Sequence, residues 1–240
     1  MNILITGGSS GLGAAITRKL AADTKNKVYF TYNNSAAKAK EIESIFENTT
    51  AIKWDFTNEE ETSALATSLS ILELDVLVNN AYTGEAIKTY FHKIPQNDFL
   101  IDFRNNLIPT IAITQAAINN FRKKKSGKII TILTSFLINN PPTGSSIYTA
   151  NKAYLEQLCK VWATENAKYK ITSNMISPSF MLTDFTKNVD SRIISQMTED
   201  HVLGSLLTTD EVAEAVEFLS KSSPHINGMN MIINAASNIK

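Results

Sequence analysis

Short apolar runs alternate with longer amphipathic segments along the whole of this 240-residue chain. Most of the runs are continuously hydrophobic, which is typical of strands buried on both faces of a parallel sheet. The longer segments carry apolar residues at three- and four-residue spacing, as amphipathic helices do. The alternation predicts one α/β domain, residues 1–240, built on a doubly wound parallel sheet of about seven strands with helices on both faces.

The expected elements can be placed to within a few residues. The predicted strands are residues 3–6, 28–32, 50–54, 76–79, 129–133, 172–176 and 229–233. The predicted helices are residues 12–22, 36–47, 59–69, 106–121, 146–168 and 210–219. Thr208 is the expected N-cap of the last helix, because acidic residues follow it in the first turn.

The composition excludes several other classes of protein. Lys and Arg number 23 and Asp and Glu number 23, so no long-range field attracts the chain to nucleic acid or an anionic membrane. No apolar run approaches the roughly 20 residues that span a bilayer, and no signal peptide opens the chain, so we expect a cytoplasmic protein. Cys159 is the single cysteine, and His92, His201 and His225 have no partners at ligand spacing, so we expect no disulfide and no metal.

A glycine-rich turn joins the first predicted strand to the first predicted helix. Gly7, Gly11 and Gly13 form the pattern G-x-x-x-G-x-G. Glycines here allow a tight turn and a close backbone approach to a pyrophosphate, and the helix N-terminus offers unpaired N–H groups to the phosphates. A lone glycine-rich turn is weak support, but its place between strand and helix favours dinucleotide binding.

A second pattern lies in the middle of the chain. Tyr148 and Lys152 are four residues apart and share one face of a helix, and Ser135 precedes them. Free tyrosine has a pKa near ~10, and an adjacent ammonium lowers that pKa toward the range useful for proton exchange. The three residues therefore predict proton transfer to a carbonyl. The alternative is a helix-surface pair and a serine that caps a strand.

Together the two patterns resemble the short-chain dehydrogenase/reductase family over residues 6–228, which implies a Rossmann-type fold and an NAD(P)-dependent enzyme. By this resemblance Tyr148 is the general acid that protonates the carbonyl oxygen as hydride arrives. Lys152 also holds the nicotinamide ribose, and Ser135 donates to the same carbonyl oxygen. Asn106 begins a run that resembles the family's Asn-Leu-x-Gly, with Pro109 in the glycine position, and supports a water relay to the lysine.

The resemblance extends to further cofactor positions. Asp55 follows the third strand, where the family has an Asp that contacts adenine. Residues 79–82 match Asn-Asn-Ala-Gly with Tyr82 for Gly, and Pro178 begins a Pro-Gly-x-x-x-Thr pattern with Ser179 for Gly. The expected cofactor-binding residues are Gly7, Ser9, Ser10, Gly11, Leu12, Gly13, Tyr32, Asn33, Asn34, Ser35, Asp55, Phe56, Asn80, Ala81, Tyr82, Tyr148, Lys152, Pro178, Ser179, Phe180, Met181 and Thr183.

The end of the second strand favours NADP(H) over NAD(H). An NAD site usually places a carboxylate there for the ribose hydroxyls, whereas residues 32–35 are uncharged and no acid follows until Glu41. Ser35 can cap the next helix, and Lys38 lies in its first turn, a plausible anion site. Ser10 argues the other way, since many NADP-using relatives carry Arg or Lys there.

The resemblance is greatest to 3-oxoacyl-acyl-carrier-protein-reductase-type members, which implies a small-molecule or acyl carbonyl substrate. It also implies a homotetramer, or a dimer, formed by the helices 106–121 and 146–168. Specificity would come from Tyr82, Phe136, Leu137, Pro142 and a substrate lid at residues 180–207. The basic run 122–128 reads either as cations at a helix C-terminus or as a docking site for an acidic carrier.

Two other functions remain open at this point. A dinucleotide-binding protein with little or no turnover is the main alternative, because Tyr82 and Ser179 replace family glycines near the nicotinamide. An epimerase or dehydratase of the extended branch is the other, although 240 residues leave little room for that branch's C-terminal domain.

Overall fold

A computed structural model describes residues 1–138, 140–186 and 189–237. Within these residues seven strands form one sheet in the order β3-β2-β1-β4-β5-β6-β7, and every pairing is parallel. The strands are β1 Asn2–Ile5, β2 Lys27–Tyr32, β3 Thr49–Lys53, β4 Val76–Asn79, β5 Gly127–Ile132, β6 Ile171–Pro178 and β7 Asn230–Ile233. The predicted doubly wound α/β fold is confirmed.

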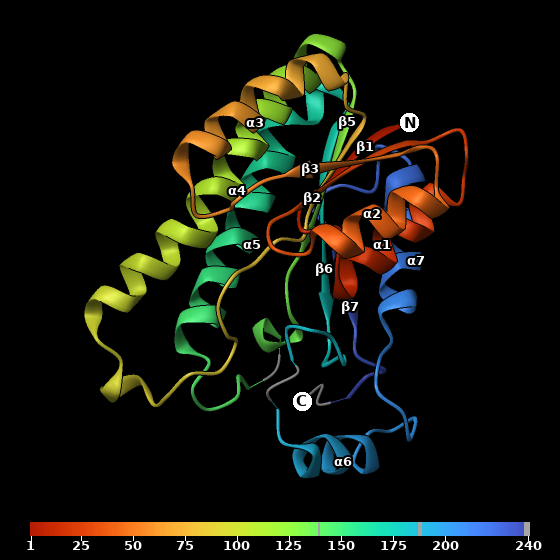
Figure 1. Cartoon of the computed structure of the whole chain (residues 1–240). Helices are drawn as coiled ribbons and strands as arrows, with labels where there is room; N and C mark the ends of the chain where they lie inside the picture. The colour runs from red at the N-terminus through yellow and green to blue at the C-terminus, as the bar shows by residue number, and fades with distance from the viewer. Residues whose placement is uncertain (139, 187–188, 238–240) are drawn as a thin grey trace.

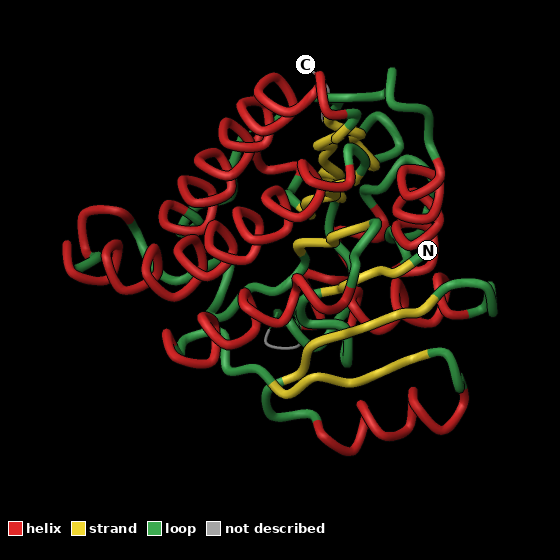
Figure 2. Tube along the Cα trace, turned by 90° about the horizontal axis from the view of Figure 1, so that it is seen from above, coloured by secondary structure: helices red, strands yellow, loops and turns green. Residues whose placement is uncertain are grey.

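Helices cover both faces of the sheet (Figures 1 and 2). The α-helices are α1 Gly11–Ala21, α2 Ala36–Ile45, α3 Glu59–Leu72, α4 Gln96–Lys124, α5 Ser146–Asn166, α6 Ser191–Glu199 and α7 Thr209–Lys221. Short 3-10 helices are η1 Phe91–Lys93, η2 Ser135–Leu137 and η3 Ala167–Tyr169. In Figure 1, α3, α4 and α5 lie on one side of the strands and α1, α2 and α7 on the other.

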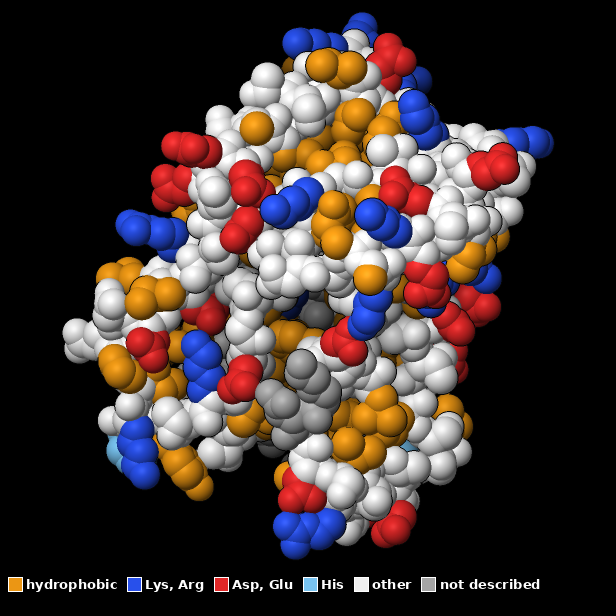
Figure 3. Space-filling view, viewed as in Figure 1, with side chains coloured by type: hydrophobic (Ala, Val, Ile, Leu, Met, Phe, Trp, Pro, Cys, Tyr) orange, Lys and Arg blue, Asp and Glu red, His pale blue; other side chains and the backbone are white. Residues whose placement is uncertain are grey.

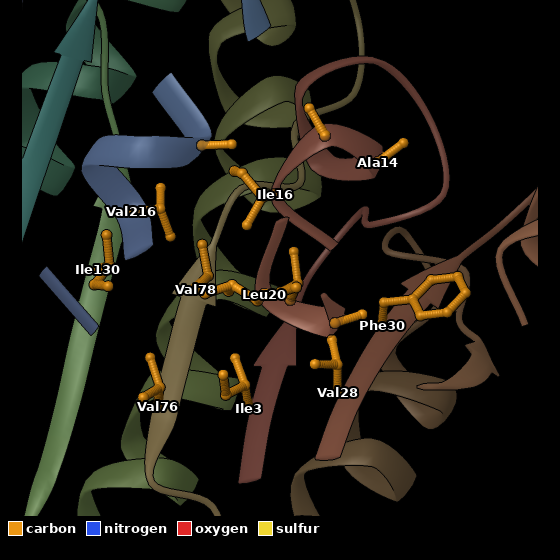
Figure 4. Close-up of a cluster of buried hydrophobic side chains, with 14 of the residues drawn as sticks. Ile3, Ala14, Ile16, Leu20, Val28, Phe30, Val76, Val78, Ile130 and Val216 are labelled. Carbon is orange, nitrogen blue, oxygen red and sulfur yellow. The ribbon is translucent and has the colours of Figure 1, made fainter. Parts of the chain in front are cut away.

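The core is divided by the sheet into two hydrophobic clusters, because successive residues of a strand point to opposite faces. In β1, Ile3 and Ile5 enter the cluster under α1 and α7, shown in Figure 4, and Leu4 enters the cluster under α4 and α5. Val78 and Leu77 of β4 divide in the same way. Burial on both faces explains why the strands read as continuous apolar runs.

Element boundaries differ most from the sequence prediction at α4, which begins at Gln96 instead of residue 106. Its first turns project from the body, and Leu100 and Ile101 are exposed there, so no single buried stripe marks them. Pro109 is accommodated within the helix. At α7 the prediction is confirmed, because Thr208 and Glu211 form a reciprocal capping box.

The carboxyl ends of the strands lie at the lower edge of the sheet in Figure 1, where α6 projects. The order of the sheet reverses between β1 and β4, and ligands of doubly wound folds bind at the crevice outside such a reversal. In the described part of the chain, no helix is both long and apolar enough to cross a membrane.

Candidate active site

The glycine-rich turn connects β1 to α1 at this edge. Gly7 and Gly11 have φ values of +66° and +50°, which residues with side chains rarely adopt. Gly13 is required for packing, because a Cβ there would lie 1.9 Å from the Gly7 carbonyl oxygen. The first turn of α1 holds no acidic residue, so its unpaired N–H groups and positive dipole end fit the pyrophosphate of a dinucleotide.

The turn after β4 is tied to the glycine-rich turn. The Thr6 hydroxyl accepts hydrogen bonds of 3.0 Å from the backbone N–H groups of Asn80 and Ala81. The Asn80 side chain donates to the carbonyl oxygens of Thr6, at 3.0 Å, and Gly7, at 3.2 Å. The two loops therefore form one rigid wall at the point where the sheet order reverses.

Uncharged polar groups gather at the end of β2, where an adenosine would lie. The hydroxyls of Ser9 and Ser35 are 2.7 Å apart and hydrogen-bonded. Ser35 is the N-cap residue of α2, as predicted, but its side chain makes no capping hydrogen bond. Its hydroxyl bonds across the cleft instead. Lys38 forms an ion pair of 2.6 Å with Asp184, from the segment after β6.

Asp55 lies beside this cluster, as predicted. Hydrogen bonds from the backbone and hydroxyl of Thr57 are the main reason that the pKa of Asp55 is lowered, with a smaller contribution from the side chain of Asn33. Phe56 differs from its neighbours, because its ring is buried in the core with its centroid 4.9 Å from that of Trp54. Its backbone alone is available to a cofactor.

Tyr148 and Lys152 share the face of α5 that turns toward the end of β5. The Lys152 ammonium lies 5.6 Å from the Tyr148 ring centroid and donates a 2.8 Å hydrogen bond to the Ile132 carbonyl oxygen. Lys152 is only 4% exposed, whereas Tyr148 is partly buried among aromatic rings. The structure thus brings the predicted pair together at the same sheet edge as the glycine-rich turn.

The electrostatics of the pair correct one expectation. Burial raises the pKa of Tyr148 to about 12, with a small opposing effect from a Thr134 hydrogen bond. The spacing of the pair predicts that Lys152 lowers the pKa of Tyr148. That prediction is wrong, because desolvation of the phenolate has the larger effect and raises this pKa. Burial also lowers the pKa of Lys152 to about 8, so its charge is weakly held near neutrality.

Asn106 and Ser135 are the other two predicted catalytic residues. Asn106 is buried on α4, where its side-chain oxygen accepts from the Thr83 N–H at 2.7 Å and its amide donates to the Thr83 carbonyl oxygen at 3.1 Å. Ser135 begins η2 and is 5% exposed. The next residue, Phe136, places its ring centroid 6.0 Å from that of Tyr148, which puts η2 beside α5.

The segment 180–207 follows β6 and covers part of the crevice; its residues 187 and 188 lie outside the described residues. The Phe185 ring contacts Tyr148, with centroids 6.0 Å apart, and Tyr82, with centroids 6.1 Å apart. No residue of α6 is buried. Two projections flank a notch in the outline of the molecule in Figure 3. One contains η1 and the start of α4, the other contains α6, and both carry hydrophobic side chains.

The remaining cofactor candidates lie around this segment. Pro178 is buried at the end of β6, and the Ser179 N–H donates to the Ile233 carbonyl oxygen at 2.9 Å. Thr183 lies against the glycine-rich turn, because a Cβ on Gly11 would be 3.3 Å from its Cβ. Leu12, Tyr32 and Met181 are partly buried and pack against the hydrophobic cluster under α1 and α7. Ser10 is the N-cap residue of α1, and Asn34 and Phe180 lie in the loops after β2 and β6.

The comparisons with known proteins agree with this arrangement. A family model described as Enoyl-(Acyl carrier protein) reductase matches residues 7–235. The chain belongs to the short-chain dehydrogenase/reductase family. It is an NAD(P)-dependent oxidoreductase with the fold of that family.

Individual members of the short-chain dehydrogenase/reductase family match nearly the whole chain. The 3-oxoacyl-[acyl-carrier-protein] reductase of Rickettsia prowazekii is 32% identical, with 96% of this chain and 94% of the relative covered. The acetoacetyl-CoA reductase of Shinella zoogloeoides is 30% identical, with 90% and 89% covered. The structure of ElxO with NADP bound is 27% identical and has a TM-score of 0.86, with 98% and 97% covered.

Sequence reasoning missed Asp102, a buried acid one helical turn before Asn106. Its carboxylate accepts hydrogen bonds from Tyr82, Asn106 and Asn151 and lies 3.4 Å from the Lys88 ammonium. Asp102 also lines a cavity of about 250 Å³ next to the site. The i, i+4 spacing of Asp102 and Asn106 was the only signal in the sequence, and it does not distinguish a buried acid from an exposed one.

Among the described residues, no group of three or more His, Cys, Asp or Glu side chains is arranged to hold a metal ion. The basic run 122–128 lies at the opposite, amino edge of the sheet. Arg122 bonds to Asn166 at 2.7 Å, Lys124 pairs with Asp75, and Lys128 donates to a backbone carbonyl. These contacts support the interpretation of the run as a helix C-terminus.

Proposed function

We propose that this protein is an NADP(H)-dependent oxidoreductase that interconverts a carbonyl and an alcohol, with Tyr148 as the general acid and base. The observation that carries the proposal is the Tyr148–Lys152 pair on α5, held at the same sheet edge as the glycine-rich turn. When bound, the nicotinamide supplies or accepts the hydride. The residues of the chain orient the substrate and move the proton.

Each side chain has a task in this scheme. The Tyr148 hydroxyl donates its proton to the carbonyl oxygen during reduction and takes it back during oxidation. The protonated Lys152 favours the phenolate that forms when Tyr148 gives up its proton. Ser135 supplies a second donor to the carbonyl oxygen, and Asn106 fixes the loop after β4 through its two bonds to Thr83.

The substrate that we propose is a 3-oxoacyl thioester. Support comes from the two relatives described above, a 3-oxoacyl-[acyl-carrier-protein] reductase and an acetoacetyl-CoA reductase. The walls of the crevice near Tyr148 are the aromatic rings of Tyr82, Phe136 and Phe185, which suit an apolar acyl group.

Tyr148→Phe is the test of this function. The variant should lose at least about a hundredfold in turnover of acetoacetyl-CoA with NADPH, because only the proton donor is removed. NADPH affinity should change by less than about threefold. Tyr154→Phe, an exposed residue of the same helix, is the matched control. A Tyr148→Phe variant with more than about a tenth of wild-type turnover contradicts the proposal. A wild-type protein that binds NADPH but reduces no carbonyl favours the non-catalytic alternative.

The preference for NADP(H) rests on the cluster at the end of β2. Ser9, Ser35 and the Lys38 cation suit a 2′-phosphate, and the Asp184 carboxylate beside them is paired with Lys38. Asn33→Asp or Asn34→Asp should move the ratio of kcat/KM values toward NADH by at least tenfold, because of like-charge repulsion in a partly desolvated site. Asn119→Asp, on the opposite edge, is the charge control. A wild-type preference for NADH refutes this part.

We also propose that α4 and α5 form the interface of a homo-oligomer. Leu155 and Trp162 of α5 are buried in the core and are not available to such an interface. Ile108 of α4 and Tyr154 and Val161 of α5 are exposed and offer an apolar surface on the same helices. Light scattering after chromatography should show a dimer or tetramer for the wild type and a smaller species for Ile108→Asp. A monomeric wild type excludes the interface.

A further inference from the structure

Tyr82 stands where the short-chain dehydrogenase/reductase pattern has glycine, and its ring packs against the proposed proton-transfer pair. The Tyr82 and Tyr148 ring centroids are 5.0 Å apart in an edge-to-face arrangement at 82°. The Lys152 ammonium lies 5.0 Å from the Tyr82 centroid. Tyr82 is not among the residues with positive φ, so this backbone position does not need glycine.

The Tyr82 hydroxyl is fixed on its far side by Asp102. One carboxylate oxygen, Oδ1, accepts from the Tyr82 hydroxyl at 2.7 Å, from Asn151 Nδ2 at 2.8 Å and from Asn106 Nδ2 at 3.1 Å. Three side-chain donors thus converge on one oxygen of the carboxyl group. Asp102 is 6% exposed, and Lys88 lies 3.4 Å from Oδ2. The ring therefore has a rigid anchor.

The buried Lys152 ammonium has few other groups that stabilise its charge. Its only hydrogen bond in the described part of the chain goes to the Ile132 carbonyl oxygen, and none of the ion pairs there includes it. Two ring faces, those of Tyr82 and Tyr148, are the remaining groups that stabilise its charge. The titratable or charged groups around it from the packed elements are Tyr82, Asp102 behind Tyr82, Tyr148, Cys159 and Glu156, which is paired with Lys160.

We propose that Tyr82 is a positioning residue for Lys152, holding the ammonium against its ring face while Asp102 fixes the ring through the Tyr82 hydroxyl. This inference rests on the proposed role of Lys152 in the proton-transfer site. The Tyr82 ring, held by its hydrogen bond to Asp102, thus occupies the position of the family's glycine. Asp102 acts only through Tyr82, Asn106 and Asn151, and is a positioning residue as well.

The expected effect follows from the strength of a desolvated cation–π contact. A desolvated cation–π contact stabilises the charged lysine by about as much as one unit of pKa. Loss of the Tyr82 ring should therefore lower the pKa of Lys152 by about one unit. From the starting value of about 8, that shift would reduce the protonated fraction at pH 8 from about a half to about a tenth. Turnover at pH 8 should fall about fivefold if protonated Lys152 is required.

Tyr82→Leu and Tyr82→Phe separate the ring from the hydroxyl. Leucine fills much of the space without a π face, whereas phenylalanine keeps the face and loses the bond to Asp102. Tyr169→Leu is the control, because Tyr169 also holds a cation over its ring, Arg122 at 4.9 Å, at the opposite edge of the sheet. For each variant, kcat and KM would be measured against pH. The pKa of Lys152 would be obtained from the pH dependence of unfolding, compared with the same variant carrying Lys152→Met.

Tyr82→Leu should shift the Lys152 pKa and the kcat profile downward by about one pH unit. Tyr82→Phe should give a smaller shift in the same direction, because the ring face is kept but its anchor to Asp102 is lost, and Tyr169→Leu should leave both unchanged. Equal pKa values and profiles for Tyr82→Leu and Tyr82→Phe would overturn the inference. If Tyr82→Leu does not fold, Asp102→Asn decides, since loosening the anchor should shift the profile in the same direction and an unchanged profile contradicts the proposal. Activity retained by Tyr148→Phe would refute the proposed function alone, because the unfolding measurement of Lys152 does not depend on turnover.

Discussion

Replacing Lys152 with methionine is expected to stabilise the cofactor-free protein while removing its activity. Lys152 is 4% exposed, and burial lowers its pKa from 10.5 to about 8. A shift of about 2.5 units corresponds to roughly 3.4 kcal/mol against the charged form in the folded state. Lys152→Met should therefore raise the free energy of unfolding by about 1–3 kcal/mol at pH 7.

The pH dependence gives this prediction its sign. The unfolded lysine binds its proton more tightly than the folded one, so the unfolded state holds more protons between about pH 8 and pH 10.5. The stability of the wild type consequently rises with pH through that window, whereas Lys152→Met lacks this contribution. The advantage of the variant should be full below pH 8 and vanish near pH 10.5. Tyr148 titrates higher, because its pKa is raised to about 12.

Urea unfolding at several pH values between 6.5 and 10.5 would test it, without dinucleotide. Lys160→Met is the matched control, because Lys160 is on the same helix but about half exposed and paired with Glu156. That control should change stability by less than about 1 kcal/mol. The reasoning is refuted if Lys152→Met is less stable than wild type at pH 7, or if its gain in the free energy of unfolding does not shrink as pH rises. Either result would show that the charged form of Lys152 does not destabilise the folded protein.

Gly13→Ala should destabilise the protein and abolish dinucleotide binding, since the new Cβ would lie 1.9 Å from the Gly7 carbonyl oxygen; thermal unfolding and NADPH titration would check it, and a variant that binds NADPH with wild-type affinity would contradict it. We expect residues 180–207 to act as a substrate lid, so their hydrogen exchange should be fast without ligand and slow with cofactor and substrate. Strong protection in the ligand-free protein would make this segment fixed core. Phe185→Ala should raise the KM for an acyl substrate more than it lowers kcat, since the Phe185 ring lies 6.0 Å from Tyr148; steady-state kinetics would check it, and an unchanged KM would remove Phe185 from the pocket.

The fold could be predicted because burial on both faces leaves a direct mark on the sequence. β4 contributes Val76, Leu77 and Val78 to the core and β5 contributes Ile129, Ile130 and Ile132, and a parallel sheet is the structure in which such apolar runs occur. The start of α4 could not be predicted, because Leu100 and Ile101 are exposed and do not form a buried stripe. Pro95 lies directly before the helix. A proline indicates a helix start only when a clear helical pattern follows it.

The candidate site could also be predicted only in part. Spacing along the chain was sufficient to bring Tyr148 and Lys152 together, since i, i+4 residues share a helix face. The pKa of Tyr148 could not be predicted from spacing, because desolvation depends on rings supplied by Tyr82, Phe136 and Phe185 from three other segments. Asp102 was missed for the same reason. A buried carboxylate looks like any helical Asp until its three donors are known.

The segment after β6 joins the two ends of the site. Thr183 lies against Gly11 of the glycine-rich turn, Asp184 pairs with Lys38 at the proposed phosphate end, and Phe185 covers Tyr148 at the proton-transfer end. We expect a phosphate that binds Lys38 to compete with Asp184 for the cation. Because Phe185 follows Asp184 in the chain and contacts Tyr148, we expect dinucleotide binding at one end to change the packing of the pocket at the other. The binding order that we predict is cofactor first and carbonyl substrate second.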